Sequence, residues 1–249
     1  MKIDIKNPFH WLYLTAFTLN VAAAALLRPL LRRQENGCVL LYGHKLNSNL
    51  KGIYDYSGEH GSKDIVVYFM TMDPAYYRQL QAAGEQVLLA INPLNILTIA
   101  RCRVIVSDHG LHALEILLKL SNIRFVDVWH GIPFKGFDAA DFRIQQQYTE
   151  IWLTSALLED LYATKFGFDR SMLHATGYAR TDVLVNRTAD CETIRQRLGV
   201  ADPGKKIILF APTWQQDESN RSIYPFNTDA DRFLGAIDRM CDRLSVVCV

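Results

Sequence analysis

Short apolar runs alternate with helical stretches along most of the chain, and this alternation limits the folds that the sequence can adopt. Each run is four to seven residues long, as buried strands of parallel sheets are. We predict strands at residues 38–42, 64–70, 86–89, 103–107, 124–128 and 150–153, and helices that begin near Asn49, Pro74, Pro93, Leu111 and Ala156. Strands that alternate with helices favour a parallel sheet with helices on both faces. The sequence therefore predicts an α/β fold, a doubly wound Rossmann-like domain.

The alternation is interrupted at residues 199–204, where two glycines and a proline predict a linker. A new strand at 205–211, a helix at 228–243 and a second strand at 244–249 are predicted to follow it. A second doubly wound domain needs several more strand–helix units than these. We therefore expect one complete Rossmann-like domain at 34–198 and the truncated start of a C-terminal domain at 205–249.

An uncharged apolar segment precedes the first predicted strand. Residues 9–27 form a run of 19 residues without a formal charge, and basic residues flank it on both sides. This length nearly matches the roughly 20 residues that span a bilayer. Four alternatives follow: a spanning helix, a helix lying in the membrane interface, a cleaved signal peptide, and a helix packed on the protein's own core. Basic flanks at both ends favour an anchored or interfacial helix, so we predict a membrane-associated helix at 1–33.

Composition excludes several classes of protein. The 249 residues carry a formal net charge of +1, which gives no electrostatic footprint for nucleic acid. The five cysteines have no paired spacing, so we expect reduced thiols and neither a disulfide framework nor a zinc site. No glycine-rich nucleotide-binding motif occurs, which argues against an ATPase or a dinucleotide enzyme. The sequence therefore predicts no cofactor, and no cluster of residues that would hold a metal tightly.

A histidine on a glycine-containing turn follows the strand predicted at 124–128. This turn, Trp129-His130-Gly131, stands at the carboxyl end of the strand, where open α/β sheets bind ligands. An imidazole at such a place can accept a proton near neutral pH. The alternative is that Trp129 and His130 only pack and form hydrogen bonds at a strand end.

This turn resembles a known family when it is compared together with three other segments. The four segments are residues 42–54, 128–136, 176–184 and 210–214, which read YGHKLNSNLKGIY, VWHGIPFKG, TGYARTDVL and FAPTW. In this order and at these separations they resemble the CDP-glycerol glycerophosphotransferases, the polymerases and primases of teichoic acid and similar polymers. The sequence departs from the family pattern at Leu50, Ile132, Ala179 and Gln215.

The resemblance implies a two-domain GT-B fold and a phosphoryl-transfer reaction. A hydroxyl group of a lipid-linked or polymer glycerol-phosphate acceptor attacks the β-phosphorus of CDP-glycerol, and CMP leaves. His130 is then the expected general base, and Gly131 allows the backbone to approach the substrate closely. Lys135 offsets phosphate charge in this interpretation, or is a solvated surface group. The expected location is the cytoplasmic face of the cell membrane.

Further residues of these segments are candidates for substrate binding. Asn47, Asn49 and Lys51 would bind an anionic ligand at the start of a helix, or serve as an N-cap and an exposed helix face. Arg180 and Asp182 would contact substrate near the domain junction, or form an internal ion pair. Residues 108–112, which read DHGLH, we interpret as a strand-to-helix turn and not as a metal site.

Two alternatives to the CDP-glycerol reaction stay open. The donor could be CDP-ribitol or a nucleotide sugar. In the resembling family most contacts to the cytidine nucleotide belong to the second domain, so the chain could also be an inactive acceptor-binding fragment.

Overall fold

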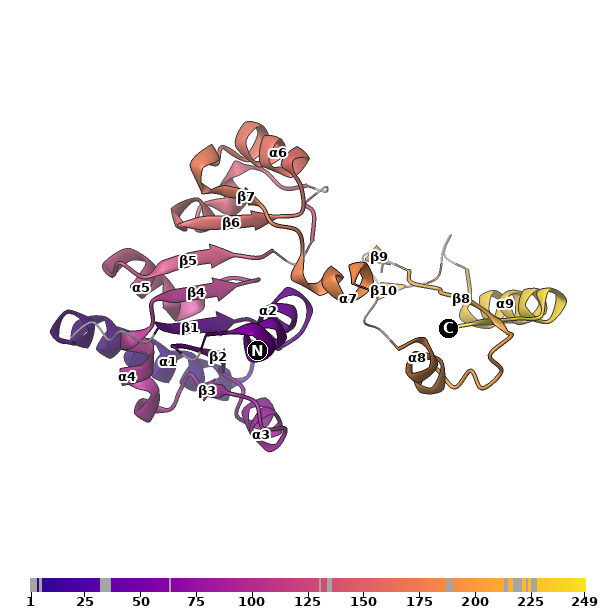
Figure 1. The fold of residues 1–249 in the computed structure, drawn as a ribbon, viewed down its shortest axis with the longest axis horizontal. Helices are drawn as coiled ribbons and strands as arrows, with labels where there is room; N and C mark the ends of the chain where they lie inside the picture. Colours follow the sequence, from indigo (N-terminus) through magenta and orange to yellow (C-terminus); the bar gives the residue numbers. More distant parts are fainter. Residues whose placement is uncertain are drawn as a thin grey trace. The chain divides into compact units, whose positions relative to one another are not determined.

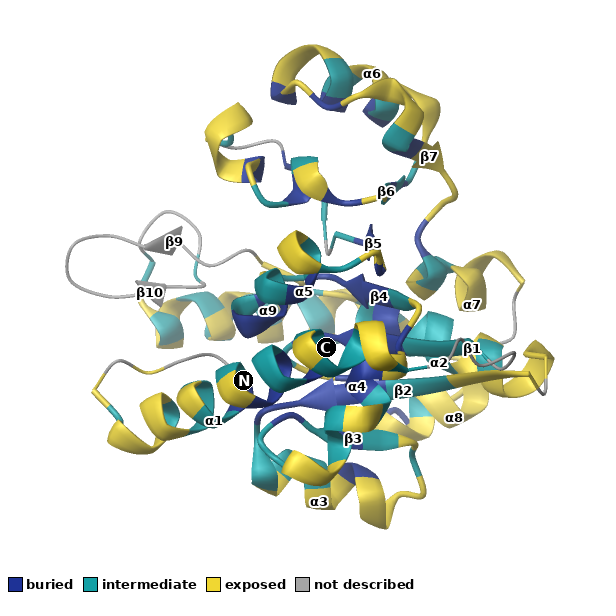
Figure 2. Cartoon of the chain, turned by 90° about the vertical axis from the view of Figure 1, so that its left-hand side faces the viewer, coloured by how far each residue is buried: buried dark blue, intermediate teal, exposed yellow. Residues whose placement is uncertain are grey.

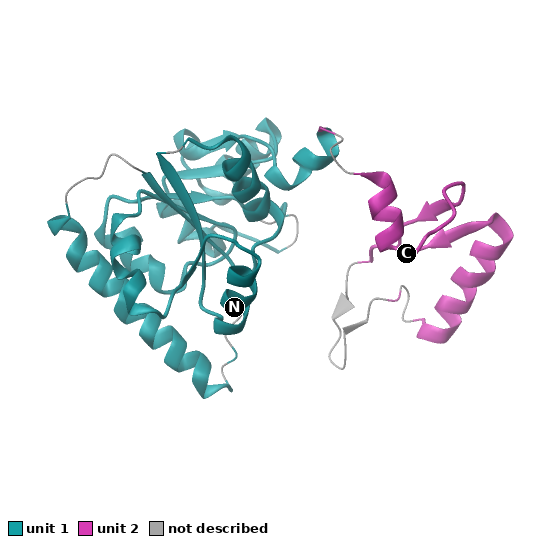
Figure 3. Cartoon of the chain, turned by 60° about the horizontal axis from the view of Figure 1, so that its bottom comes forward, with its two compact units in different colours: residues 1–185 teal, residues 186–249 magenta. Residues whose placement is uncertain are grey.

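The computed structural model describes residues 4, 6–31, 37–62, 64–129, 131–133, 136–186, 190–212, 215–216, 221–222, 224 and 228–249. The chain divides into two compact units, Met1–Val185 and Asn186–Val249 (Figure 3).

A seven-stranded parallel sheet forms the first unit, with helices on both faces (Figure 1). The strands are β1 (Gly37–Tyr42), β2 (Ile65–Thr71), β3 (Val87–Leu89), β4 (Val104–Ser107), β5 (Arg124–Asp127), β6 (Glu150–Leu153) and β7 (Leu173–Ala175). Their order in the sheet is β3-β2-β1-β4-β5-β6-β7. The chain runs from β1 out to β3, returns to β4 beside β1, and continues to β7. The doubly wound prediction is confirmed, and β1 and β4 flank the topological switch point.

Helices and short 3₁₀ turns connect the strands. The α-helices of this unit are α1 (Pro8–Leu27), α2 (Ser48–His60), α3 (Pro74–Ala82), α4 (Ile96–Arg101), α5 (Glu115–Leu120), α6 (Ala156–Phe166) and α7 (Asp182–Val185). The 3₁₀ turns are η1 (Arg28–Leu30), η2 (Pro93–Asn95), η3 (His112–Leu114), η4 (Ala139–Phe142), η5 (Gln145–Gln147), η6 (Arg170–Met172) and η7 (Ala179–Thr181). The capping oxygens explain two of the starts: Asp73 accepts hydrogen bonds from the amides of Ala75 and Tyr76, and Asn92 accepts one from Leu94.

The apolar helix α1 covers one face of the sheet beside α4, α5 and η3. Its Phe17, Val21 and Ala24 are fully buried, and a buried phenylalanine contributes about 1.5–3 kcal/mol to stability. The side-chain amide of Asn20 donates to the carbonyl of Ala90 over 2.9 Å. One side of the helix is therefore packed on the protein's own core, while the opposite side is exposed.

The sheet separates two apolar cores, and its central strands are buried (Figure 2). The first core lies under α1, α4, α5 and α6, and the second lies under α2 and α3. Alternating residues of β1 point into each, with Leu40 in the first and Leu41 in the second.

Helix α2 lies unusually close to η7, which follows β7. A methyl group added at Gly52 of α2 would lie 2.8 Å from the carbonyl carbon of Ala179 and 2.9 Å from its oxygen. Both distances are shorter than a carbon side chain tolerates. The absence of a side chain at Gly52 therefore sets how closely α2 and η7 pack.

The second unit contains a small parallel pair of strands. Its elements are α8 (Cys191–Arg197), β8 (Lys206–Ile208), β9 (Gln215–Gln216), β10 (Arg221–Ser222), α9 (Ala230–Leu244) and β11 (Val246–Cys248). β8 pairs with β11, which confirms the predicted strand, helix and strand after the linker. The Asp229 carboxylate accepts a hydrogen bond from the amide of Arg232 and caps α9.

The Gly52 contact gives a test of the packing between α2 and η7. We expect Gly52→Ala to lower the free energy of unfolding by about 1–3 kcal/mol, because the methyl group must displace the backbone of η7. Gly58→Ala in the same helix is the matched control, since no atom lies within 4 Å of its added methyl group. That change should stabilise by about 0.5–1 kcal/mol through helix propensity. Urea denaturation measures both values, and equal stabilisation by the two substitutions would contradict the close approach.

Candidate functional site

Loops from three strands meet at the carboxyl edge of the sheet through the side chain of Asn49. This residue is 1% exposed, at the start of α2. Its Nδ2 donates to the carbonyls of Val128, over 2.8 Å, and Trp129, over 3.0 Å. Its Oδ1 accepts a hydrogen bond of 3.3 Å from the amide of Arg180. One amide therefore joins the loop after β1 to the turn after β5 and to η7.

A second contact joins the turn after β5 to the segment after β7. The Tyr178 hydroxyl donates to the carbonyl of Gly131 over 2.7 Å. The Arg180 guanidinium lies 4.7 Å from the centre of the Tyr178 ring and donates to the Ser48 hydroxyl over 3.2 Å. Three of the four segments that carry the family resemblance thus lie against one another.

A pocket of about 130 Å³ opens between these segments. Asn49 and Val128 line one part of it, Trp152 of β6 another, and Gly177 and Asp182 a third. The pocket lies at the carboxyl edge of a parallel sheet, which is the ligand-binding edge of open α/β folds.

The predicted site residues are distributed unevenly around this pocket. Asn47 is the exposed N-cap residue of α2, and no capping hydrogen bond from its side chain is formed. Lys51 forms ion pairs with Asp55 and, over 3.9 Å, with Glu85. Arg180 and Asp182 are exposed. His130 and Lys135 lie outside the described residues, so their roles stay predictions.

The structure also assembles a polar cluster that the sequence interpretation did not assign to the site. His44 from the loop after β1 meets Asp108, His109 and His112 from the loop after β4, and we refer to these four residues as the switch-point cluster. The rings of His44 and His109 are 4.5 Å apart between centroids, and those of His44 and His112 are 6.3 Å apart. Nδ1 of His109 is 2.7 Å from the buried Asp108 carboxylate. The segment 108–112 is a strand-to-helix turn as predicted, but its side chains are grouped.

Burial keeps two of the four residues of this cluster, His44 and His112, neutral. Burial, together with the neighbouring His109 and His112, lowers the pKa of His44 to about 4, and burial also lowers the pKa of His112. The buried Tyr42 hydroxyl, whose pKa is raised by desolvation, lies 2.9 Å from Nδ1 of His112. A phenol that keeps its proton can both donate and accept a hydrogen bond, so the His112 tautomer sets the direction of this one. At neutral pH, His44 and His112 are therefore uncharged.

A buried acidic residue, Asp127, ends β5 three residues before His130 in the sequence. Asp127 is 1% exposed, and its Oδ2 has no hydrogen-bond partner within the described part of the chain. Burial, with a smaller contribution from the Asp108 charge, raises the pKa of Asp127 well above its usual range. The protonated form is favoured because an unpaired carboxylate in such surroundings is costly.

Within the ranges that the structure describes, no three His, Cys, Asp or Glu side chains are grouped as metal ligands would be.

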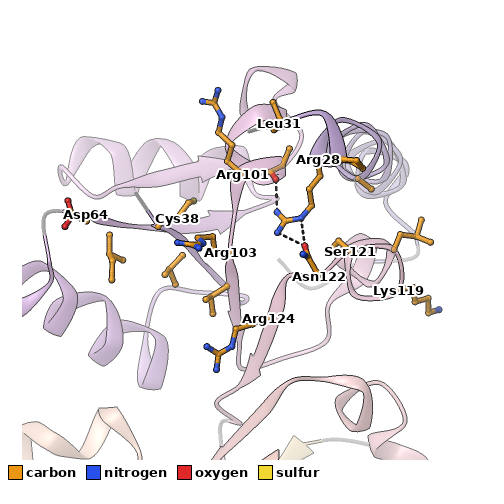
Figure 4. Close-up of a pocket in the computed structure, with 18 residues that line it drawn as sticks. Arg28, Leu31, Cys38, Asp64, Arg101, Arg103, Lys119, Ser121, Asn122 and Arg124 are labelled. Atoms are coloured by element: carbon orange, nitrogen blue, oxygen red, sulfur yellow. Dashed lines mark hydrogen bonds between the residues drawn. The ribbon is translucent and has the colours of Figure 1, made fainter. Parts of the chain in front are cut away.

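A larger groove, of about 1150 Å³, lies at the opposite, amino edge of the sheet (Figure 4). Its charged lining residues are mainly basic. Among the described residues they are Arg28, Arg101, Arg103, Lys119, Arg124 and one acid, Asp64. Arg28 is held in place by the carbonyls of Ala100 and Cys102 and by Asn122. None of the predicted site residues that the structure describes lies here.

Comparison with known proteins finds relatives among enzymes of teichoic acid synthesis. A teichoic acid glycerol-phosphate transferase of Staphylococcus aureus is 23% identical over 211 residues, which cover 76% of this chain and 53% of the relative. A teichoic acid poly(glycerol phosphate) polymerase of Staphylococcus epidermidis is 30% identical over 139 residues, covering 46% of this chain and 19% of the relative. The chain thus spans about half, or less, of the length of these relatives.

The fold has a counterpart among solved structures. A structure of the wall teichoic acid polymerase TagF, a variant soaked with CDPG, superposes with a TM-score of 0.66 at 17% identity, covering 93% of this chain and 60% of that chain. This likeness confirms the GT-B-like α/β fold. The model of the family described as CDP-Glycerol:Poly(glycerophosphate) glycerophosphotransferase matches residues 30–240. Since this match spans most of the sequence, the chain belongs to the CDP-glycerol:poly(glycerophosphate) glycerophosphotransferase family.

Proposed function

We propose that the chain transfers glycerol phosphate from CDP-glycerol to a lipid-linked or polymer glycerol-phosphate acceptor, in the synthesis of a teichoic-acid-like cell-surface polymer. Membership of the family supports this reaction. The observation that carries the proposal is the convergence of three family-like segments around the buried Asn49 amide, beside a pocket at the carboxyl edge.

In the proposed reaction, an oxygen of the acceptor's hydroxyl group attacks the β-phosphorus of CDP-glycerol. The bond between that phosphorus and the oxygen bridging to CMP breaks, and CMP leaves with the bonding electrons. Catalysis of such a transfer depends on positioning and on the stabilisation of phosphate charge. We assign proton removal to His130, charge stabilisation to Lys135 and Arg180, and close backbone approach to Gly131. Asn49 acts through the backbone that it holds, while Asn47, Lys51 and Asp182 border the region in which substrate is proposed to lie.

A second donor has support from at least three relatives, which are ribitol-phosphate polymerases. A teichoic acid poly(ribitol-phosphate) polymerase of Bacillus spizizenii is 31% identical over 126 residues, covering 45% of this chain. CDP-ribitol is therefore the alternative donor. Release of CMP from CDP-glycerol, CDP-ribitol and a nucleotide sugar, assayed in parallel, separates these candidates.

A further alternative is that this chain is an acceptor-binding fragment. The sequence interpretation places most donor contacts outside the complete domain. Calorimetry of the chain with CDP-glycerol tests this placement. Affinity in the nanomolar to low-micromolar range for the chain alone would contradict it.

The role of His130 gives the first functional prediction. His130→Ala should lower the rate of CMP release by about 10²- to 10⁴-fold, the usual contribution of a general base, while the circular dichroism spectrum stays unchanged. His60→Ala is the control, because His60 is an exposed imidazole at the end of α2. Turnover at the wild-type rate in the His130 variant would remove the base assignment.

We also propose that the first unit binds the cytoplasmic face of the membrane as a peripheral protein. α1 with η1 is long enough and apolar enough to cross a membrane, by length and composition alone. Because the inner side of α1 is packed on the sheet, the proposed contact with lipid is made by its outer side. Leu12, Leu19 and Leu26 recur every seven residues, nearly two helical turns, and are all exposed on that side. A continuous exposed apolar line of this kind indicates an interaction surface.

The basic groove supplies the complementary charge. Ala25, Arg28 and Leu31 border it, so the apolar line of α1 ends at the groove. Arg101 ends α4 and Arg103 precedes β4, and both are exposed without an ionic partner among the described residues (Figure 4). An apolar helix face beside cationic side chains is the arrangement of interfacial helices on anionic lipid.

Vesicle sedimentation tests this surface. We expect the pair Leu19→Glu and Leu26→Glu to abolish binding to vesicles with 30% phosphatidylglycerol, since it places two carboxylates among acyl chains. The pair Arg101→Glu and Arg103→Glu should weaken binding at least 10-fold, given about 1 kcal/mol for each basic residue near the surface. Leu157→Glu on α6, at a residue 77% exposed, is the control. Equal sedimentation of all variants, or equal binding to uncharged vesicles, would contradict the proposal.

A further inference from the structure

Two cysteines of the first unit are neighbours at the amino edge of the sheet. Cys38 belongs to β1, and Cys102 lies between α4 and β4. β1 pairs with β4, and the amide of Arg103 donates to the carbonyl of Cys38 over 2.8 Å. The Cys102 sulfur lies 3.5 Å from the same carbonyl oxygen. Two thiols that are 64 positions apart in the sequence are thus brought together by the pairing of these strands.

Both cysteine side chains lie on the same side of the sheet. The Cys38 sulfur is 4.0 Å from the carbonyl oxygen of Thr98 in α4, and both cysteines pack in the core under α1 and α4. Adjacent strands are about 4.7–4.9 Å apart, which is within the span of about 4.4–6.8 Å between the Cα atoms of a disulfide. The spacing of the two backbones is therefore compatible with a disulfide bond.

The two thiols differ in exposure and in acidity. Cys38 is half-buried and lines the basic groove (Figure 4), whereas Cys102 is 1% exposed. The neighbouring Cys102 thiol lowers the pKa of Cys38, and burial raises the pKa of Cys102 well above its usual range. Reactive cysteines are partly exposed in electropositive surroundings, and the thiolate is the nucleophile. Cys38 is thus the sulfur that reacts first with a small oxidant, and Cys102 is the second thiol behind it.

We propose that Cys38 and Cys102 are a peroxide-sensitive pair that forms a reversible disulfide. In the first step the Cys38 thiolate attacks an oxygen of hydrogen peroxide, the O–O bond breaks, and the leaving hydroxide takes up a proton to form water. Cys38 is thereby oxidised to a sulfenic acid, and the peroxide is reduced. In the second step the Cys102 sulfur attacks the Cys38 sulfur and the S–O bond breaks. The thiol proton leaves with the hydroxide as a second water molecule.

The disulfide would join β1 to the segment that holds the end of α1. The Arg28 guanidinium, at this end, donates to the carbonyl of Ala100 over 2.8 Å and to that of Cys102 over 2.6 Å. Cys38 and Arg28 also line the same groove. Oxidation of the pair therefore acts on the packing of α1 and on the wall of the basic groove.

Peptide mapping of the whole chain after treatment with hydrogen peroxide tests the pair. Trypsin cleaves after Lys and Arg, so Cys38 is in the peptide 34–45 and Cys102 is in the dipeptide 102–103. After a brief exposure to a small excess of peroxide and alkylation of the remaining thiols, we expect these two peptides to be joined by a disulfide. A dithiol reductant should release them. Linked peptides that contain Cys191, an exposed cysteine of α8, should be rarer and serve as the reference.

Two substitutions separate the roles of the two sulfurs. Cys102→Ser should abolish the linked peptides and leave Cys38 as a sulfenic acid, which a cyclic diketone labels. Cys38→Ser should abolish the linked peptides and leave Cys102 as an unmodified thiol. Cys191→Ser is the matched control and should leave the yield of the linked peptides unchanged. Circular dichroism checks the fold of each variant.

The wild-type chain decides on the disulfide, so a variant that fails to fold does not affect that result. Absence of the linked peptides from the folded wild-type chain would overturn the proposal, as would an equal yield of links from Cys38 to the other cysteines. A diketone label on Cys102 in folded Cys38→Ser would overturn the assignment of the first step to Cys38.

Discussion

The buried side-chain amide of Asn49 is the interaction on which the arrangement of the carboxyl edge depends. Its three hydrogen bonds reach backbone atoms 79, 80 and 131 residues away along the chain. Each satisfies a polar group that would otherwise be costly to bury. Without them, the contact between Tyr178 and Gly131 would still join the turn after β5 to the segment after β7, but the start of α2 would lose these hydrogen bonds to both. The polar site is thus held by a residue that is itself almost inaccessible to solvent.

The sequence was sufficient to predict most strands of the sheet, but not the side-chain contacts between the loops that follow them. β1 to β6 were predictable because each is an apolar run between turn signals, whereas β7 has only Leu173 buried and gives no such pattern. The capping roles of Asp73 and Asn92 follow from local chemistry and were also predictable. The partners of Asn49 were not, since they depend on strand order. His44 and His109 meet for the same reason, because β4 returns to pair with β1.

Helix α1 shows why composition alone left several alternatives open. A helix that covers a sheet and a helix that enters a membrane both need a long uncharged apolar segment. In the structure the two sides of the helix differ. Phe17, Val21 and Ala24 are buried on the side that covers the sheet, while Leu12 and Leu19 are exposed on the opposite side. The basic residues beyond its end include Arg28, which hydrogen-bonds within the domain and is therefore also structural.

The position of α1 in the chain also has a consequence during synthesis. Its end is fastened by Arg28 to Asn122, a partner 94 residues later. At about 5–20 residues per second, a ribosome makes that partner roughly 5–20 seconds after the helix. For that interval the sheet that covers α1 is incomplete, because β5, β6 and β7 are still to be made. The apolar surface of α1 is therefore made before the core that buries it is complete.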